Sequence, residues 1–258
     1  MNAKINRILK KKNKKKIVCL TAYSKNIAEI IDYHTDLVLV GDSLASVLYN
    51  YNSTRKITLN MMIEHAKSVR QGITKSLMVF DMPYNTYKNK SMALKNAKRV
   101  IKETKCDAVK LEGGLKIKKI IQHLIKNKIN VLGHLGITPQ SVRGKFRSKG
   151  KTDIEKRQIM RDAKLLEELG VFAIVLECVE TKLAKKITEN INVPTIGIGS
   201  SVNCDGQILV TDDLIGLTNS KIRFVKKFSN IQNTINKAVK KFKYDVKYKK
   251  YPTKKYSY

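Results

Sequence analysis

The chain has 258 residues, of which 42% are hydrophobic, so it can bury the core of one large α/β domain or two small ones. It has no apolar run near the roughly 18 residues of a membrane helix, and no apolar signal segment follows its basic start. Its four cysteines are scattered, which favours neither a zinc site nor disulfide bonds. The net charge of +31 is nearly all lysine, found with many Asn and Ile as in A/T-rich coding, so we expect a cytoplasmic protein without a membrane or a specific nucleic-acid partner.

Short apolar runs alternate with amphipathic helical stretches along the chain, which is typical of repeated βα units. The runs expected as strands are Ile17–Thr21, Leu37–Val40, Leu77–Phe80, Ala108–Leu111, Asn130–Leu132, Phe172–Leu176, Thr195–Ile198 and Ile208–Val210. They are nearly continuous in hydrophobicity, as strands buried on both faces should be. This pattern predicts a (βα)8 TIM barrel, which typically needs roughly 250 residues.

A barrel of this size would use the whole chain, so we expect a single domain over residues 1–258. It would carry a basic N-terminal helix over about residues 1–16 and a basic C-terminal helix or tail over about residues 230–258. Ser91 and Thr181 are expected to cap two of the intervening helices. Thr152 with Glu155 forms a capping-box sequence, and Gly170 is expected to end that helix.

Ionisable side chains follow five consecutive strands. In chain order they are Asp42 with Ser43, then Asp81, then Lys110 with Glu112, then His134, and then Glu177. Because the carboxyl ends of barrel strands meet at one face, and active sites of such barrels lie there, we expect these side chains to share one site.

Three carboxylates from neighbouring strands, Asp42, Asp81 and Glu112, predict a hard oxygen site suited to Mg²⁺. Substrate and water would complete the coordination, and a 2-oxo acid is a natural partner because it chelates one metal with its carboxylate and keto oxygens. The metal would stabilise an enolate. Glu177, at the end of an apolar strand, is the candidate base, because apolar surroundings raise a carboxyl pKa.

Each of these residues also has a simpler interpretation. Asp42 could cap a helix, Asp81 could be a turn residue, and Glu112 could lie in solvent. His134 could satisfy a backbone carbonyl. Lys110 could be a surface lysine or the Schiff-base lysine of a different aldolase chemistry. Their common position at the strand ends favours the functional interpretation.

Seven segments resemble the ketopantoate hydroxymethyltransferase family, in family order and over nearly the whole chain. They are Leu20–Tyr23, Val40–Leu44, Asp81–Tyr84, Val109–Gly114, Gly133–Ser141, Leu176–Val179 and Asp205–Val210. The resemblance implies transfer of a hydroxymethyl group from 5,10-methylenetetrahydrofolate to 3-methyl-2-oxobutanoate, which forms 2-dehydropantoate in pantothenate synthesis. It also implies a homo-oligomer, a decamer in bacterial members.

By the same resemblance, Asp42 and Asp81 bind Mg²⁺ and Glu112 completes or water-bridges the metal site. Ser43, Asp42, Asp81 and Lys110 hold the oxo acid, His134 lies in the same mouth, and Glu177 takes the C3 proton. The resemblance therefore implies that Lys110 binds substrate and does not form a Schiff base.

The chain departs from the family pattern at several positions, among them Ser24, the basic loop Arg143–Arg147 and the pair Ser200–Ser201. None of these departures removes a proposed ligand or base. Two other functions stay open. One is a Mg²⁺-dependent aldolase or lyase acting on another 2-oxo acid without folate, and the other is a basic nucleic-acid-binding protein on a barrel scaffold.

Overall fold

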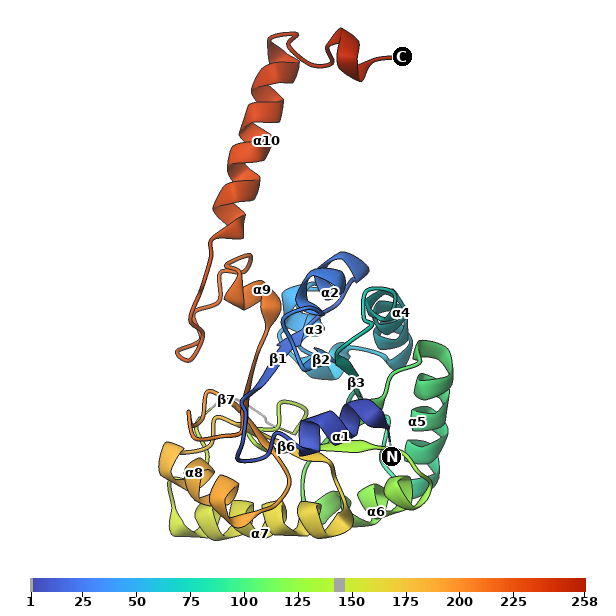
Figure 1. The fold of residues 1–258 in the computed structure, drawn as a ribbon, viewed down its shortest axis with the longest axis vertical. Helices are drawn as coiled ribbons and strands as arrows, with labels where there is room; N and C mark the ends of the chain where they lie inside the picture. Colours follow the sequence, from blue (N-terminus) through green and yellow to red (C-terminus); the bar gives the residue numbers. More distant parts are fainter. Residues whose placement is uncertain (1, 142–146) are drawn as a thin grey trace. The chain divides into compact units, whose positions relative to one another are not determined.

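Eight parallel strands form a closed barrel in a computed structural model of the chain, which describes residues 2–141 and 147–258 (Figure 1). The strands are β1 (Ile17–Thr21), β2 (Leu37–Val40), β3 (Leu77–Asp81), β4 (Ala108–Glu112), β5 (Val131–Gly136), β6 (Ala173–Glu177), β7 (Thr195–Ile198) and β8 (Gly206–Leu209). Each strand pairs with its neighbour in chain order, and β8 pairs with β1 to close the barrel. The predicted fold class is confirmed.

Four strands extend further toward their carboxyl ends than the apolar runs predict. Strands β3, β4 and β6 end on Asp81, Glu112 and Glu177, and His134 lies inside β5. Backbone pairing continues there because a parallel ladder requires only N–H and C=O groups, whatever the side chain. Polar side chains that were expected in loops therefore lie on the rigid sheet.

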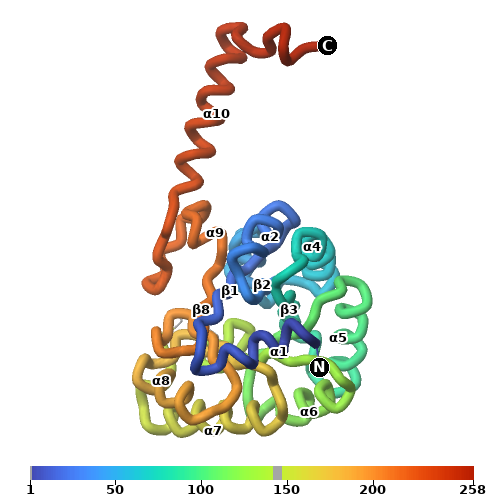
Figure 2. Tube along the Cα trace, viewed as in Figure 1, coloured from blue at the N-terminus to red at the C-terminus, as the bar shows by residue number. Residues whose placement is uncertain are grey.

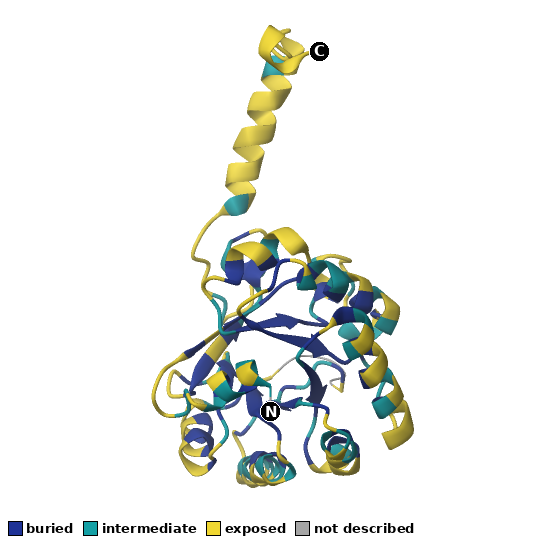
Figure 3. Ribbon diagram, turned by 45° about the vertical axis from the view of Figure 1, so that its right-hand side comes forward, coloured by how far each residue is buried: buried dark blue, intermediate teal, exposed yellow. Residues whose placement is uncertain are grey.

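Helices cover the outside of the strands, as the ribbon and the Cα trace show (Figures 1 and 2). The helices of the barrel unit are α1 (Ala3–Leu9), α2 (Lys25–Ile31), α3 (Leu44–Val47), α4 (Leu59–Arg70), α5 (Lys90–Thr104), α6 (Lys118–Lys126), α7 (Asp153–Leu169) and α8 (Thr181–Asn190), with the 3-10 turns η1 (Thr54–Lys56) and η2 (Leu115–Ile117). Buried residues line the inner sides of the helices, and exposed residues line the outer sides (Figure 3).

The capping predictions are partly confirmed. Thr152 caps α7 by accepting from the backbone N–H of Glu155, and Gly170 ends it in the left-handed region at φ 90°. The predicted caps of two other helices were wrong. Asn89 caps α5 in place of Ser91, and Glu180 caps α8 in place of Thr181, because their side-chain oxygens reach the free N–H groups of the first turn.

The predicted basic N-terminal helix is shorter than expected, and it closes the floor of the barrel. Ile5 and Ile8 of α1 are buried in a cluster with residues that begin the strands, such as Leu37 and Leu77. Some of the lysines that follow α1 contact the barrel unit through their ammonium groups. Lys12, for example, donates to the carbonyl oxygen of Thr188 and lies 2.9 Å from Asp205 Oδ2.

Internal contacts divide the chain into two compact units, Met1–Val210 and Thr211–Tyr258. The second unit contains α9 (Thr211–Leu214), α10 (Ile231–Lys247) and η3 (Lys254–Tyr256), so a basic C-terminal helix is present. The assignment of all 258 residues to one domain stays a prediction. Among the described residues, no helix combines the length and the apolarity that crossing a bilayer requires.

Candidate active site

All the predicted site residues lie at the carboxyl-terminal mouth of the barrel. Strand register places them side by side, because Asp81 is the Cα partner of Lys110 and Glu112 is the Cα partner of His134. Glu177 is the partner of Gly136 on the next strand pair. Every one of these strands is part of the closed barrel, so the geometry of the site depends on the sheet itself.

Lys110 lies at the centre of the cluster and is buried. Its ammonium is 2.9 Å from Asp81 Oδ2, 3.8 Å from Glu112 Oε1 and 3.2 Å from His134 Nδ1. Burial alone would lower the pKa of Lys110, but the facing carboxylates of Asp81, Glu112 and Asp42 outweigh burial and raise the pKa. A Schiff-base lysine needs a lowered pKa to become a nucleophile, so Lys110 is suited to binding an anion and unsuited to that chemistry.

Asp81 is buried among like charges. Its Oδ2 accepts a hydrogen bond from the backbone N–H of Asp42 at 3.1 Å, while its Oδ1 is buried without a hydrogen-bond partner among the described residues. Burial raises the pKa of Asp81 well above its usual range, and the neighbouring Asp42 and Glu112 add to this, against the opposing effect of Lys110. A divalent cation beside Asp81 would offset both the cost of burying its negative charge and the repulsion from Asp42 and Glu112.

Asp42 is not a helix cap. Ser43 is the N-cap residue of α3, and no side chain caps that helix. Asp42 Oδ2 instead accepts a hydrogen bond at 2.9 Å from the side-chain amide of Gln140. The Ser43 hydroxyl lies 2.8 Å from the hydroxyl of Tyr23, which places Ser43 at the edge of the same mouth.

His134 and Glu177 form the other side of the site. His134 Nε2 is 3.2 Å from Glu177 Oε2, and Nδ1 is 3.5 Å from Glu112 Oε1. Burial and Lys110 lower the pKa of His134, but Glu112 and Glu177 outweigh them and raise it to about 9. The side chain of Glu177 is 20% exposed and faces this imidazole, so its surroundings are more polar than the apolar strand end suggests.

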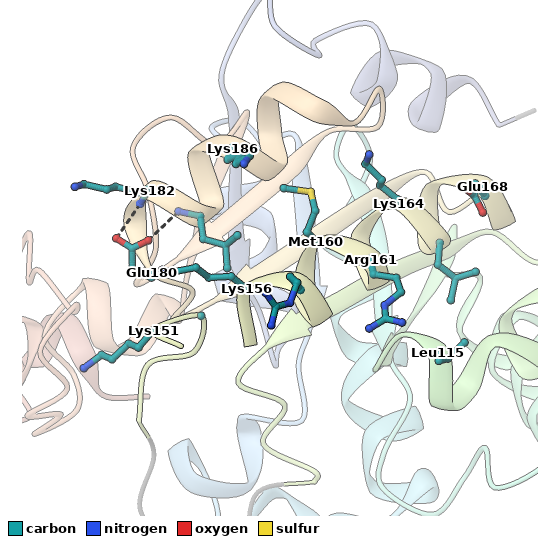
Figure 4. A pocket seen from close by; sticks show the side chains of 14 residues that line it. Leu115, Lys151, Lys156, Met160, Arg161, Lys164, Glu168, Glu180, Lys182 and Lys186 are labelled. Atoms are coloured by element: carbon teal, nitrogen blue, oxygen red, sulfur yellow. Dashed lines mark hydrogen bonds between the residues drawn. The ribbon is translucent and has the colours of Figure 1, made fainter. Parts of the chain in front are cut away.

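A cavity of about 1030 Å³ adjoins the cluster. It is lined by Glu112 and by residues from the loops after β3, β4 and β5, among them Tyr84, Gly113 and Gln140. A second groove, of about 1020 Å³, lies on the outer wall between α7 and α8 (Figure 4). That groove contains none of the predicted site residues. Basic side chains such as Arg161, Lys164 and Lys186 line it, which fits the lysine excess of the whole chain.

The donor set fits a hard divalent cation. The carboxylate oxygens Asp81 Oδ1 and Glu112 Oε1 are both buried without a hydrogen-bond partner among the described residues, and oxygen atoms of this kind are the ligands that Mg²⁺ prefers. Within the described part of the chain, no group of three or more His, Cys, Asp or Glu side chains forms a ready metal cage. A bound ion would therefore need ligands from water or substrate, as Mg²⁺ commonly does.

Gln140 is a site residue that the sequence interpretation did not assign. It is buried in the turn after β5, and it contacts both Asp42 and Glu112. Its signals in the sequence are its place in the family-like segment Gly133–Ser141 and its position four residues beyond the end of β5. Neither signal shows that the side chain is buried or which carboxylates it contacts.

Two of the departures from the family pattern, Ser24 and Ser200, follow strands β1 and β7. Ser24 is the N-cap residue of α2, and its side chain makes no capping hydrogen bond. The hydroxyl of Ser200 donates to the carbonyl oxygen of Val179 at 2.9 Å. Residues 143–146 of the basic loop lie outside the described residues, and Arg147 lies 2.7 Å from Glu155 Oε1.

Comparisons with known proteins agree with one another. The profile of the ketopantoate hydroxymethyltransferase family matches residues 2–254. The 3-methyl-2-oxobutanoate hydroxymethyltransferase of Pelagibacter ubique is 66% identical over 258 residues, which is the full length of both chains. The enzyme of the same name from Anaplasma marginale (strain St. Maries) is 45% identical over 250 residues, covering 96% of this chain and 90% of that one.

Solved structures with little sequence similarity share the fold. A phosphoenolpyruvate phosphomutase from Streptomyces platensis aligns with a TM-score of 0.63 at 9% identity, covering 95% of this chain and 87% of that one. A phosphonopyruvate hydrolase, solved with oxalate and Mg²⁺, aligns with a TM-score of 0.61 at 8% identity and covers 81% of each chain. At such low identity the likeness concerns the barrel alone.

Proposed function

Because this chain belongs to the ketopantoate hydroxymethyltransferase family, we propose that it transfers a hydroxymethyl group from 5,10-methylenetetrahydrofolate to 3-methyl-2-oxobutanoate, forming 2-dehydropantoate. The chain is a transferase of pantothenate biosynthesis by this membership. The observation that carries the finer proposal is the buried cluster in which Lys110 contacts Asp81 and Glu112 beside the His134–Glu177 pair.

The first role of the site is to bind the oxo acid. Lys110 is a buried cation whose raised pKa keeps it charged, so it can face the negative charge of the substrate. Asp42 and Asp81 would hold Mg²⁺, Glu112 would complete the site directly or through water, and Ser43 would contribute a hydroxyl at the edge of the oxo-acid site. When bound, Mg²⁺ supplies the Lewis acidity that makes the C3 proton of a 2-oxo acid easier to remove.

The second role is proton transfer. Glu177 takes the proton from C3 of 3-methyl-2-oxobutanoate, and the resulting enolate forms the new C–C bond to the one-carbon unit. The bonds from that carbon to the folate nitrogens break, water supplies the hydroxyl group of the product, and tetrahydrofolate leaves. His134 Nε2 is 3.2 Å from Glu177 Oε2, where a small rotation of either side chain gives a hydrogen bond. After that rotation the imidazole would hold one carboxylate oxygen of Glu177 and leave the other oxygen to act as the base.

Exchange of the C3 proton tests this half of the reaction without folate. Proton NMR of 3-methyl-2-oxobutanoate in D₂O should show exchange that requires both the protein and Mg²⁺. In Glu177→Gln the exchange should fall by about 100-fold or more, the usual contribution of a general base, while Mg²⁺ and oxo-acid binding persist. Glu29→Gln, at an exposed position on α2, is the matched control and should exchange like the wild type.

Two results would contradict the proposal. Undiminished exchange in Glu177→Gln would remove Glu177 from the role of base. If exchange is absent even with a bound folate analogue, the substrate is a different one. Formation of a product without methylenetetrahydrofolate would favour the alternative of a Mg²⁺-dependent aldolase or lyase.

We also propose a homo-oligomer, on the strength of the family resemblance. It is supported by α10, none of whose residues is buried within the second unit. Its apolar residues Ile235, Val239, Phe242 and Val246 are each about half exposed. Apolar residues at this alternating spacing of four and three are typical of a helix that packs against another subunit. The decamer and the cytoplasmic location stay predictions; light scattering tests the former.

A further inference from the structure

One buried glutamine connects two of the acidic strands. The side-chain amide of Gln140 donates to Asp42 Oδ2 at 2.9 Å and to the carbonyl oxygen of Met82 at 3.0 Å. Its backbone N–H donates to Glu112 Oε2 at 3.0 Å, and its Oε1 accepts from the hydroxyl of Tyr87 at 2.6 Å. The side chain of Gln140 therefore has both its polar atoms engaged. With its side chain on Asp42 and its backbone N–H on Glu112, the residue bridges the carboxyl ends of β2 and β4.

The orientation of this amide is determined by its partners. Turning the amide over would place its oxygen against Asp42 Oδ2 and the carbonyl oxygen of Met82, which are both acceptors. The hydroxyl of Tyr87 agrees with this orientation, because it donates to Gln140 Oε1. Gln140 thus always presents N–H groups to the carboxylate.

The two carboxylates that Gln140 contacts are each held through one oxygen. Glu112 Oε2 accepts from Gln140, while Glu112 Oε1 has no hydrogen-bond partner in the described chain and lies 3.8 Å from the Lys110 ammonium. Asp42 is held through Oδ2 in the same way. Each carboxylate is thereby kept from rotating freely, and its second oxygen is left for a ligand.

We propose that Gln140 is the positioning residue of the cation and oxo-acid site, holding Asp42 and Glu112 in the orientation that binds a divalent cation. The identity of the oxo acid rests on the function proposed above, whereas the effect on cation binding does not. Hydrogen-bond partners of metal ligands typically change metal affinity or activity by about 10- to 100-fold when they are removed. Gln140 would act through the carboxylates, without touching the reacting atoms.

Gln140→Met tests this inference. Methionine keeps the length of the side chain and the backbone N–H to Glu112 but removes the amide. Isothermal titration with Mg²⁺ alone, without substrate, should show an affinity about 10- to 100-fold weaker than that of the wild type. Gln122→Met, at an exposed position on α6, is the matched control and should bind Mg²⁺ like the wild type. Circular dichroism and thermal melting establish that each variant is folded.

Tyr87→Phe provides an independent route that leaves the glutamine in place. Removing the hydroxyl frees Gln140 Oε1, so this variant should weaken Mg²⁺ binding by less than Gln140→Met does. Because Tyr87 acts through Gln140, the double variant should bind Mg²⁺ no more weakly than Gln140→Met alone. If Gln140→Met does not fold, Tyr87→Phe alone still tests the inference, because this variant must then weaken Mg²⁺ binding by itself.

The outcomes separate this inference from the proposed function. Wild-type Mg²⁺ affinity in a folded Gln140→Met variant, or in Tyr87→Phe when that variant alone is folded, would overturn the role of Gln140 even if the wild-type enzyme makes 2-dehydropantoate. Additive effects of the two substitutions would overturn the route through Tyr87 and Gln140. Weakened Mg²⁺ binding in a protein whose wild type makes no 2-dehydropantoate would support the inference and contradict the function.

Discussion

Lys110 illustrates how surroundings decide the role of a residue. Its ammonium lies within 4 Å of both Asp81 and Glu112, and these charges raise its pKa although burial opposes them. The sequence left Lys110 open as a surface lysine, a Schiff-base lysine or a substrate binder. Burial excludes the first role and the raised pKa opposes the second, so binding an anionic substrate is the role that its surroundings favour.

Asp32 is a buried carboxylate with a structural role, and its pKa is shifted in the opposite direction to that of Asp81 in the active site. It follows α2 and accepts hydrogen bonds from the backbone N–H groups of Thr74, Lys75 and Ser76, in the loop that leads into β3. Burial alone would raise the pKa of Asp32, but these hydrogen bonds outweigh burial and hold the pKa well below its usual range. Asp32 thus stabilises the loop in its ionised form.

Asp32→Asn should therefore lower the free energy of unfolding near pH 7 by about 1–3 kcal/mol, the usual value of hydrogen bonds to a charged group. Because the folded pKa is depressed, this contribution is present above the unfolded pKa of about 3.9 and is lost as the pH falls below it toward the folded pKa. Urea unfolding at several pH values should show the two proteins converging in acid. Glu168→Gln, at an exposed site on α7, is the control. A constant difference down to pH 3 would contradict the assignment.

At the scale of elements, α1 has a larger role than its length suggests. Seven residues form the helix, and two of them, Ile5 and Ile8, are buried among residues of most of the strands at the floor of the barrel. The lysine-rich sequence around it predicted a basic helix but gave no sign that it covers the core. A short helix of this kind would not be stable alone, so packing must maintain it.

Ile8→Ala should lower the free energy of unfolding by about 2–5 kcal/mol, because it leaves a cavity at the floor that neighbouring strands can fill only in part. Ile154→Ala is the matched control, since Ile154 is 75% exposed, and it should change stability by less than about 0.5 kcal/mol. Chemical denaturation measures both variants. Equal stabilities of the two variants would show that α1 does not contribute to the core in solution.

The molecule as a whole carries a net charge of +31, which attracts polyanions such as nucleic acids. Part of the charge is already engaged inside the chain, as Lys11 with Asp36 and Lys12 with Asp205 show. The transferase function of the family does not require nucleic acid. We therefore expect any such binding to be electrostatic only.

Binding of a short DNA duplex, measured by fluorescence anisotropy, should be detectable near 50 mM salt and lost by about 200 mM, because a protein with 6–10 phosphate contacts loses roughly 10³–10⁵ in affinity over that range. Duplexes of different sequence should bind equally. Affinity that persists at physiological salt with a preference for one sequence or structure would instead favour the nucleic-acid-binding alternative.

The sequence by itself determined the architecture and the location of the site. Its apolar runs mark the eight strands within a few residues, because burial on both faces requires local hydrophobicity that is visible without knowing the partners. The same order places the candidate residues at the carboxyl ends of their strands. Cap residues were harder to predict, since Ser91 and Asn89 are both good capping residues and only helix packing selects between them.

Only the tertiary structure decided which side chains meet. Strand register pairs Asp81 with Lys110 and Glu112 with His134, and a shift by one residue would turn each side chain to the opposite face of the barrel. The bridge from Gln140 to Asp42 joins residues 98 positions apart. Such contacts depend on the closure of the barrel and on the path of a loop, which local patterns do not encode, and the electrostatic character of the site follows from these distances.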